Sequence, residues 1–299
     1  MTVSRALRGE KHVAAPLRQR VAEVAAEIGY QPDPEIVKLM AHMRRARKNL
    51  APQVLALVWA DREPGGEVIS PWSARLRMGA VQRAEALGYR LDEFHLREKG
   101  MTARRLSGIL EARGIAGVVL TPLLTRSRGH VSMAWEKFSS VAIGIGYSRP
   151  ALHRVHHHHY VGMLTAMRQL KKLGYRRIGL FGPTTVNERM FGAWSASFLM
   201  HHPLPVRQAM ELVCLQKTPT QAAFQAWLTS ARPEVVLDAG SHYDWLQAVA
   251  AAGEVGYAAL NWTPDHPERA GIDQQAEVLG AAALDLLAGQ LQHNERGIP

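Results

Sequence analysis

The chain has 299 residues, of which 36 are Lys or Arg and 26 are Asp or Glu, so its formal net charge is +10. Its 47% hydrophobic content is enough for a full core and excludes wholesale disorder, while no apolar run approaches the roughly 20 residues of a membrane span. The first twenty residues contain no apolar stretch of signal-peptide length, and the single cysteine, Cys214, excludes an intramolecular disulfide framework. These features indicate a cytoplasmic protein of about two domains.

The positive charge is concentrated at the N-terminus. Residues 1–50 contain ten basic and five acidic side chains, so one sixth of the chain carries half of the charge excess. Such a concentration is typical of a module that binds a polyanion, although a solvated helical face with a linker would have the same charge. The same region predicts short helices over residues 2–7, 16–28 and 35–42, followed by a basic linker over 44–49.

From Gln53 onward, apolar strands alternate with helices. We expect strands over residues 53–60, 90–96, 115–120, 141–145, 177–181, 211–215, 235–238 and 257–260. We expect helices over residues 73–87, 102–113, 161–173, 188–200, 220–230, 243–252 and 275–290. Strands separated by helices of ten or more residues indicate an α/β fold with two doubly wound parallel sheets, and the chain would cross between them near residues 150–155.

Three segments carry a family resemblance. Residues 2–9 read Thr-Val-Ser-Arg-Ala-Leu-Arg-Gly, residues 17–32 run from Leu-Arg-Gln-Arg-Val to Ile-Gly-Tyr-Gln-Pro, and residues 169–178 read QLKKLGYRRI. In this order and at this spacing they resemble the lactose-repressor (LacI/GalR) family of bacterial transcription regulators, over essentially the whole chain. The first segment is similar to that family's recognition helix, and the third is similar to the start of its second subdomain.

The resemblance implies a modular architecture. Its parts would be a partial helix-turn-helix headpiece over 1–34, a hinge helix and basic linker over 35–50, and a periplasmic-binding-protein-like core over 51–299. The core would divide into an N-subdomain, about 53–150 with 275–299, and a C-subdomain, about 151–274. Compared with relatives, the sequence begins inside the helix-turn-helix and stops before a further strand, which leaves operator binding by the chain as written open.

On the DNA side, the resemblance implies that the recognition helix enters the major groove. Arg5 is the candidate base reader, because a guanidinium can bond guanine O6 and N7 together, and a surface salt bridge is its alternative. Thr2 and Ser4 would contact phosphates. Leu39 would be a hinge-helix wedge in the minor groove, unless it packs against its own domain. Basic side chains would add salt-dependent phosphate contacts, namely Lys38, Arg44, Arg45, Arg47 and Lys48.

The same resemblance implies a homodimer on a near-palindromic double-stranded operator. It also places a small effector, a sugar or a related metabolite, between the two core subdomains, beyond the carboxyl ends of the strands. The candidate side chains there are Asp61, Trp72, Arg189, Asp238, Asn261 and Gln274.

Each of these candidates has an alternative. Trp72 would stack on a ring or merely pack, and Arg189 would bind effector oxygens or form a structural ion pair. Asn261 stands where relatives usually carry Asp. Because an amide both donates and accepts hydrogen bonds, we expect a pocket that differs from that of a typical sugar-responsive member.

Two further features bear on chemistry. The run His156 to His159 invites a metal hypothesis, but alternate side chains of an extended segment face opposite sides, and no Cys or acidic pair stands nearby. We therefore expect neither a metal nor a cofactor. There is no G-x-S-x-G elbow, Walker A loop or H-E-x-x-H motif, which disfavours an enzyme. The sequence predicts a DNA-binding transcription regulator, a repressor rather than an activator; a stand-alone solute-binding protein is the alternative.

Overall fold

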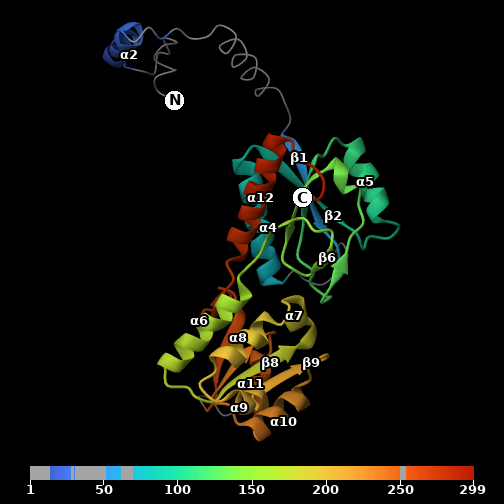
Figure 1. Ribbon diagram of the computed structural model, residues 1–299, viewed down its shortest axis with the longest axis vertical. Coiled ribbons are helices and arrows are strands. Elements are labelled where there is room, and N and C mark those ends of the chain that lie inside the picture. The colour runs from blue at the N-terminus through green and yellow to red at the C-terminus, as the bar shows by residue number, and fades with distance from the viewer. Residues whose placement is uncertain (1–13, 28–29, 31–51, 62–69, 250–253) are drawn as a thin grey trace. The chain divides into compact units, whose positions relative to one another are not determined.

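The computed structural model describes residues 14–27, 30, 52–61, 70–249 and 254–299 (Figure 1). The chain divides into two compact units, Met1–Ala51 and Pro52–Pro299. In the first unit the described helix is α2, Ala15–Glu27, close to the predicted bounds. The expected recognition helix, hinge helix and basic linker lie outside the described residues. No helix in the described part of the chain is long and apolar enough to cross a membrane.

The described residues of the second unit form two parallel five-stranded sheets, which confirms the predicted fold class. The first sheet has the order β2-β1-β3-β5-β7, with β1 Gln53–Trp59, β2 Tyr89–His95, β3 Gly117–Leu120, β5 Ser139–Ile143 and β7 His153–Val155. Its helices are α4 Pro71–Ala86, α5 Ala103–Ala112 and α12 Ala276–His293. Beside them lie the 3-10 helix η1 Trp135–Lys137 and a small parallel pair, β4 Gly129–His130 and β6 Tyr147–Arg149.

The second sheet repeats the same topology. Its order is β12-β11-β10-β8-β9, with β8 Ile178–Pro183, β9 Val213–Gln216, β10 Val235–Asp238, β11 Gly256–Trp262 and β12 Ala270–Asp273. Its helices are α6 His159–Lys172, α7 Thr184–Arg189, α8 Ala193–His201, α9 Val206–Glu211, α10 Gln221–Ala231 and α11 Tyr243–Val249.

Strand β1 shows why the first sheet is covered on both faces. Leu55, Leu57 and Trp59 belong to a buried cluster that includes side chains of α4 and α12. Ala56 and Val58 belong to a second cluster, which includes side chains of α5. Because successive strand residues point to opposite faces, an unbroken apolar run such as QVLALVW indicates a strand buried on both sides.

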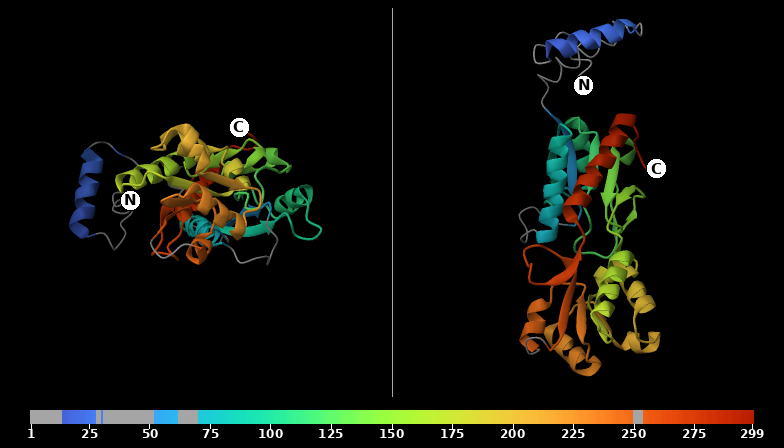
Figure 2. Two further views of the ribbon diagram at one scale, coloured as in Figure 1. Left: turned by 90° about the horizontal axis from the view of Figure 1, so that it is seen from below. Right: turned by 90° about the vertical axis from the view of Figure 1, so that its left-hand side faces the viewer.

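Helices α4 and α12 lie side by side along one face of the first sheet (Figure 2). They approach closely because each carries a glycine at the contact. A Cβ on Gly79 would lie 2.1 Å from the Glu277 carbonyl oxygen, and a Cβ on Gly280 would lie 2.2 Å from that of Leu76. The close contact holds the last helix of the chain on the first subdomain, after β12 has joined the second sheet.

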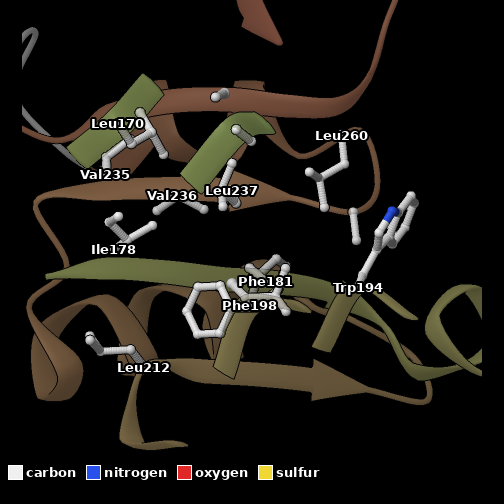
Figure 3. Close-up of a cluster of buried hydrophobic side chains, with 14 of the residues drawn as sticks. Leu170, Ile178, Phe181, Trp194, Phe198, Leu212, Val235, Val236, Leu237 and Leu260 are labelled. Atoms are coloured by element: carbon white, nitrogen blue, oxygen red, sulfur yellow. The ribbon is translucent and has the colours of Figure 1, made fainter. Parts of the chain in front are cut away.

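The second sheet has an aromatic and aliphatic core. Phe181 of β8 packs edge-on against Phe224 of α10, with ring centroids 4.6 Å apart. Figure 3 shows strand side chains of this sheet together with side chains of α6 and α8, among them Ile178, Val236, Leu237, Leu170 and Phe198. This core gives the second subdomain a rigid frame of its own.

Three local features differ from the sequence-based expectation. The single helix expected over 188–200 is two helices, α7 and α8, because Phe191 and Gly192 adopt positive φ values of 55° and 71° between them. Strand β7 pairs with β5, so the chain leaves the first sheet after Val155. Strand β12 was not expected, because a four-residue edge strand reading Ala-Gly-Ile-Asp has little apolar alternation.

Candidate functional site

One cavity lies at the topological switch points of both sheets, which are the places where the strand order reverses. In sheets of this order, ligands bind beyond the carboxyl ends of the strands, where the strand order reverses. The first sheet contributes Asp61 after β1 and residues 122–125 after β3, and the second contributes Val186 after β8 and residues 239–242 after β10. The cavity has a volume of about 790 Å³, within the size range of small-molecule sites.

The predicted effector residues fall into two groups. Those that line the cavity are Asp61, Trp72, Arg189, Asn261 and Gln274. Asp238 does not line it: this residue is 1% exposed and bonds to groups of its own subdomain. Asp238 is therefore not placed to contact an effector directly.

Asp61 fixes the turn that follows β3. Its Oδ2 accepts hydrogen bonds from the backbone N–H groups of Leu124 and Thr125, both at 2.8 Å, and from the Thr125 hydroxyl at 3.1 Å. The carboxylate thereby satisfies backbone donors that a turn leaves without partners. The turn is held in place against the first sheet at the edge of the cavity.

Arg189 ends α7 and reaches the same turn from the second subdomain. Its Nε donates to the Arg126 carbonyl oxygen at 2.9 Å, and its Nη2 donates to that of Leu124 at 2.8 Å. Burial lowers the pKa of Arg189, and the nearby Asp61 carboxylate opposes this shift. Among the described residues no acid forms an ion pair with this guanidinium, so the structural ion pair considered for it is absent there.

A second contact joins the subdomains beside Arg189. The guanidinium carbon of Arg128 lies 3.5 Å from the centroid of the Phe191 ring, a cation–π distance. Phe191 follows α7 directly after Met190 and has a left-handed backbone, which aims its ring at the turn. Arg189 lines the cavity, whereas Phe191 contacts the same turn outside the cavity lining.

Asp238 organises a polar cluster behind the cavity wall. It accepts hydrogen bonds from the backbone N–H groups of Gly240 and His242 at 2.7 Å, from His242 Nδ1 at 2.9 Å and from the Tyr257 hydroxyl at 2.8 Å. Burial acts to raise the pKa of Asp238, but these bonds and the His242 ring outweigh it, and the pKa stays below its ordinary value. Since Nδ1 of His242 bonds to the carboxylate, Nε2 is the ring nitrogen left for the cavity.

Two cavity-lining rings have buried nitrogen atoms with no hydrogen-bond partner among the described residues, Trp72 Nε1 and His159 Nδ1. His159 is 7% exposed and packs edge-on against Trp194, with centroids 5.6 Å apart. Burial lowers the pKa of His159 to about 3, so its imidazole is neutral near pH 7. Because buried polar groups are normally paired, both atoms are candidates for a ligand contact.

Two amides complete the polar lining. Gln274 is buried and donates from Nε2 to the Leu260 carbonyl oxygen at 2.8 Å, which fixes the orientation of its amide. Asn261 is exposed and lines the cavity from the end of β11. One amide is therefore held rigidly, and the other can rotate to suit a ligand.

Sequence analysis did not assign the cavity histidines. His156, His157, His159 and His242 all line the cavity. The signal available for His242 is its position four residues after the strand-end acid Asp238, whereas the run 156–159 is interpreted as the exit of a crossover strand, with a metal site as the disfavoured alternative. Within the described ranges, no group of three or more His, Cys, Asp or Glu side chains is placed to hold a metal ion.

The candidate DNA-contacting residues lie outside the described residues. They are Thr2, Ser4, Arg5, Lys38, Leu39, Arg44 and Arg45. Their assignment depends on the sequence alone. Residues 1–33 match the model of the lacI family of bacterial regulatory proteins. The N-terminal segment of the chain is therefore similar to the DNA-binding region of that family.

Solved structures of LacI-type regulators share the fold. A lac repressor dimer bound to operator and the anti-inducer ONPF is 17% identical, with a TM-score of 0.59, over 99% of this chain and 90% of that one. A complex of the transcriptional regulator CelR with cellobiose is 17% identical, with a TM-score of 0.58, over 97% and 89%. A LacI regulator from a Rhodococcus species is 13% identical, with a TM-score of 0.60, over 82% and 92%. No curated protein matches this chain in sequence.

Proposed function

We propose that this chain is a LacI-type transcription regulator, which controls its affinity for operator DNA through a small molecule that binds in the cavity between its two sheets. The observation that carries the proposal is the cavity itself, about 790 Å³ and lined from the switch points of both sheets. A ligand in this position contacts both subdomains, so its binding free energy depends on the angle between them. Such differential binding is what a ligand needs in order to shift a two-state equilibrium.

The contacts at the edge of the cavity support a bistable arrangement. Arg189 and Phe191 of the second subdomain reach the turn over residues 124–128 of the first. Among the described residues, the contacts of Arg189 and Phe191 with this turn are two hydrogen bonds to carbonyl oxygens and one cation–π contact, each of modest free energy. A ligand of ordinary affinity can therefore favour either an arrangement in which these contacts are formed or one in which they are broken.

The roles of individual side chains follow from the geometry. Trp72 and His159 offer ring nitrogens that have no hydrogen-bond partner among the described residues, and Asn261 and Gln274 offer amide groups. Asp238 positions His242 and does not touch the ligand. Asp61 positions the turn after β3, because its Oδ2 accepts three hydrogen bonds from that turn.

The partners we propose are those of a dimeric repressor. The lac repressor structure is a dimer bound to operator, and the CelR structure is a complex with cellobiose. By likeness to them, this chain would act as a cytoplasmic homodimer on near-palindromic double-stranded DNA. Its effector would be a sugar or a related metabolite, and the bound operator would be repressed.

The alternative is a solute-binding protein without DNA binding, and the salt dependence of the affinity for duplex DNA distinguishes the two functions. The affinity of the full chain for duplex DNA is measured at increasing salt concentration. Each phosphate that is neutralised contributes about −0.9 to the slope of log K against log salt on duplex DNA, and we expect a slope of several units. A matched variant, Arg44→Gln with Arg45→Gln, is expected to make the slope less steep. A slope near zero for the unmodified chain would refute the proposal.

A further inference from the structure

Several arginines of the first subdomain are paired with acids. Arg75 bonds to Glu277 at 2.5 Å, and Arg83 bonds to Asp285 at 2.6 Å. Arg90 and Arg113 both bond to Asp92. At these positions positive charge is balanced locally, whereas the exposed Arg104 and Arg105 of α5 form no ion pair among the described residues.

Arginines around the cavity have no such partners. Arg97, Arg128, Arg154 and Arg189 form no ion pair with any acid in the described part of the chain. Arg97 and Arg189 line the cavity. Arg154 donates to the carbonyl oxygens of Tyr147 and Pro150, and its pKa is lowered by burial and by the charge of Arg128. Within the described ranges, the charge of these four arginines is therefore not neutralised by an ion pair.

The cavity lining itself is poor in negative charge. Among the described residues that line it, Asp61 is the one acid, against two arginines. Its Oδ2 already accepts three hydrogen bonds from the turn after β3. A cleft with low-dielectric walls concentrates the potential of such a lining, so anions are attracted into it.

Arg189 is the clearest case. Its Nε and Nη2 bond to carbonyl oxygens, which satisfy the donors but carry no net charge, and Nη1 has no acceptor among the described residues. The Asp61 carboxylate acts on this charge, but its Oδ2 also accepts three hydrogen bonds from the turn, and burial still lowers the pKa of Arg189. The hydroxyl groups of a neutral sugar would add no negative charge beside Arg189, whereas a carboxylate or phosphate would add one and accept charge-assisted hydrogen bonds.

We propose that the ligand of this cavity is an anion, a small molecule that carries a carboxylate or phosphate group and binds to Arg97 and Arg189. The inference rests on the proposed function of the site and adds the charge of its ligand. Trp72 Nε1 and His159 Nδ1, which have no hydrogen-bond partner among the described residues and line the same cavity, are additional positions for contacts to the anion's oxygens or to its neutral part.

The test compares probes that differ in charge. Glucose, gluconate and glucose 6-phosphate are titrated into the full chain by calorimetry at one ionic strength. We expect an anionic sugar to bind at least about tenfold more tightly than glucose. The two charged sugars distinguish a carboxylate from a phosphate site. If glucose binds as tightly as both, or if neither charged sugar binds, the proposal is overturned.

Two variants with the same change of charge locate the site. Arg97→Gln removes a cavity arginine that makes no described hydrogen bond, and Arg90→Gln removes one that is paired with Asp92 on the outer surface. We expect Arg97→Gln to weaken binding of the anionic probe about tenfold and Arg90→Gln to leave it unchanged. Equal affinity of the unmodified chain and the Arg97→Gln variant would overturn the assignment.

The outcomes separate this inference from the proposed function. A neutral ligand that binds the cavity and changes DNA affinity would refute the anion and leave the regulator mechanism intact. An anion that binds to Arg97 and Arg189 without changing DNA affinity would support the anion site and refute the mechanism.

Discussion

Asp61 and Arg189 bind the two backbone polar groups of the same residue, Leu124, from opposite subdomains. The Leu124 N–H donates to Asp61 Oδ2, and the Leu124 carbonyl oxygen accepts from Arg189 Nη2, each at 2.8 Å. Asp61 follows β1 of the first sheet, and Arg189 ends α7 beside the second. Any ligand that moves Arg189 therefore also acts on a turn fixed to the first sheet.

The cation–π contact beside this turn predicts an energetic coupling. In a double-mutant cycle, Arg128→Ala and Phe191→Ala are expected to show an interaction free energy of about 0.5–1 kcal/mol, because both side chains are exposed. The measurement is urea unfolding of the two single variants and the double variant. Strictly additive free energies of unfolding would show that the contact contributes nothing to holding the subdomains together.

Two glycines of α12, Gly280 and Gly289, are expected to respond in opposite ways to substitution by alanine, as measured by the stability of the protein. Gly280→Ala would place a Cβ 2.2 Å from a backbone oxygen, so the helices must separate, and we expect a loss of about 1–3 kcal/mol of stability or more. Gly289→Ala meets no atom within 4 Å, and its better helix propensity should stabilise the protein by about 0.5–1 kcal/mol. Denaturant unfolding tests both, and equal effects would contradict the packing described.

Removal of the buried Asp238 carboxylate is expected to cause a large loss of stability. Asp238→Ala would leave two backbone N–H groups, the His242 ring and the Tyr257 hydroxyl without their acceptor, and we expect a loss of about 3–5 kcal/mol. The matched control is Asp285→Asn, an exposed partner of Arg83, which should cost less than about 1 kcal/mol. Comparable losses in the two variants would argue against the buried cluster.

His159 predicts a pH dependence of stability. Its pKa is about 3 in the folded protein against an ordinary value of 6.5, because burial disfavours the charged ring. Between these values the unfolded chain binds a proton that the folded chain does not, so stability is lost as the pH falls below about 6.5, by up to about 1.4 kcal/mol per pH unit. The stability is fully present above that pH.

The check is a comparison with His159→Phe, which keeps a ring against Trp194 and cannot take up the proton. Free energies of unfolding are measured between about pH 7 and pH 5 for both proteins, and the variant is expected to lose less stability over this range. Parallel pH profiles would mean that His159 is not held neutral by burial.

Much of the fold could be predicted because its signals are local. Apolar runs such as that of β1 indicate strands buried on both faces, and ten-residue helices between them indicate parallel connections. The break between α7 and α8 could not be predicted from Gly192 alone. It also depends on a left-handed Phe191, which is paired with Arg128 from another part of the chain.

The candidate site was predicted by position better than by role. Residues that follow expected strands, such as Asp61 and Asn261, do line the cavity, because strand ends meet there. Asp238 also ends a strand, but its side chain turns inward to the backbone of residues 240–242. That direction is set by tertiary hydrogen bonds and leaves no mark in a sequence pattern, and the same holds for the cavity histidines.

The most direct test of the account is the affinity of the full chain for its operator, measured with and without a saturating ligand of the cavity. The operator is first selected from random duplexes. We expect the ligand to change DNA affinity about 5- to 150-fold, with the same factor for the effect of DNA on ligand affinity, and Trp72→Ala to weaken the ligand response without changing DNA affinity in its absence. A ligand that saturates the cavity and leaves operator affinity unchanged would contradict the account.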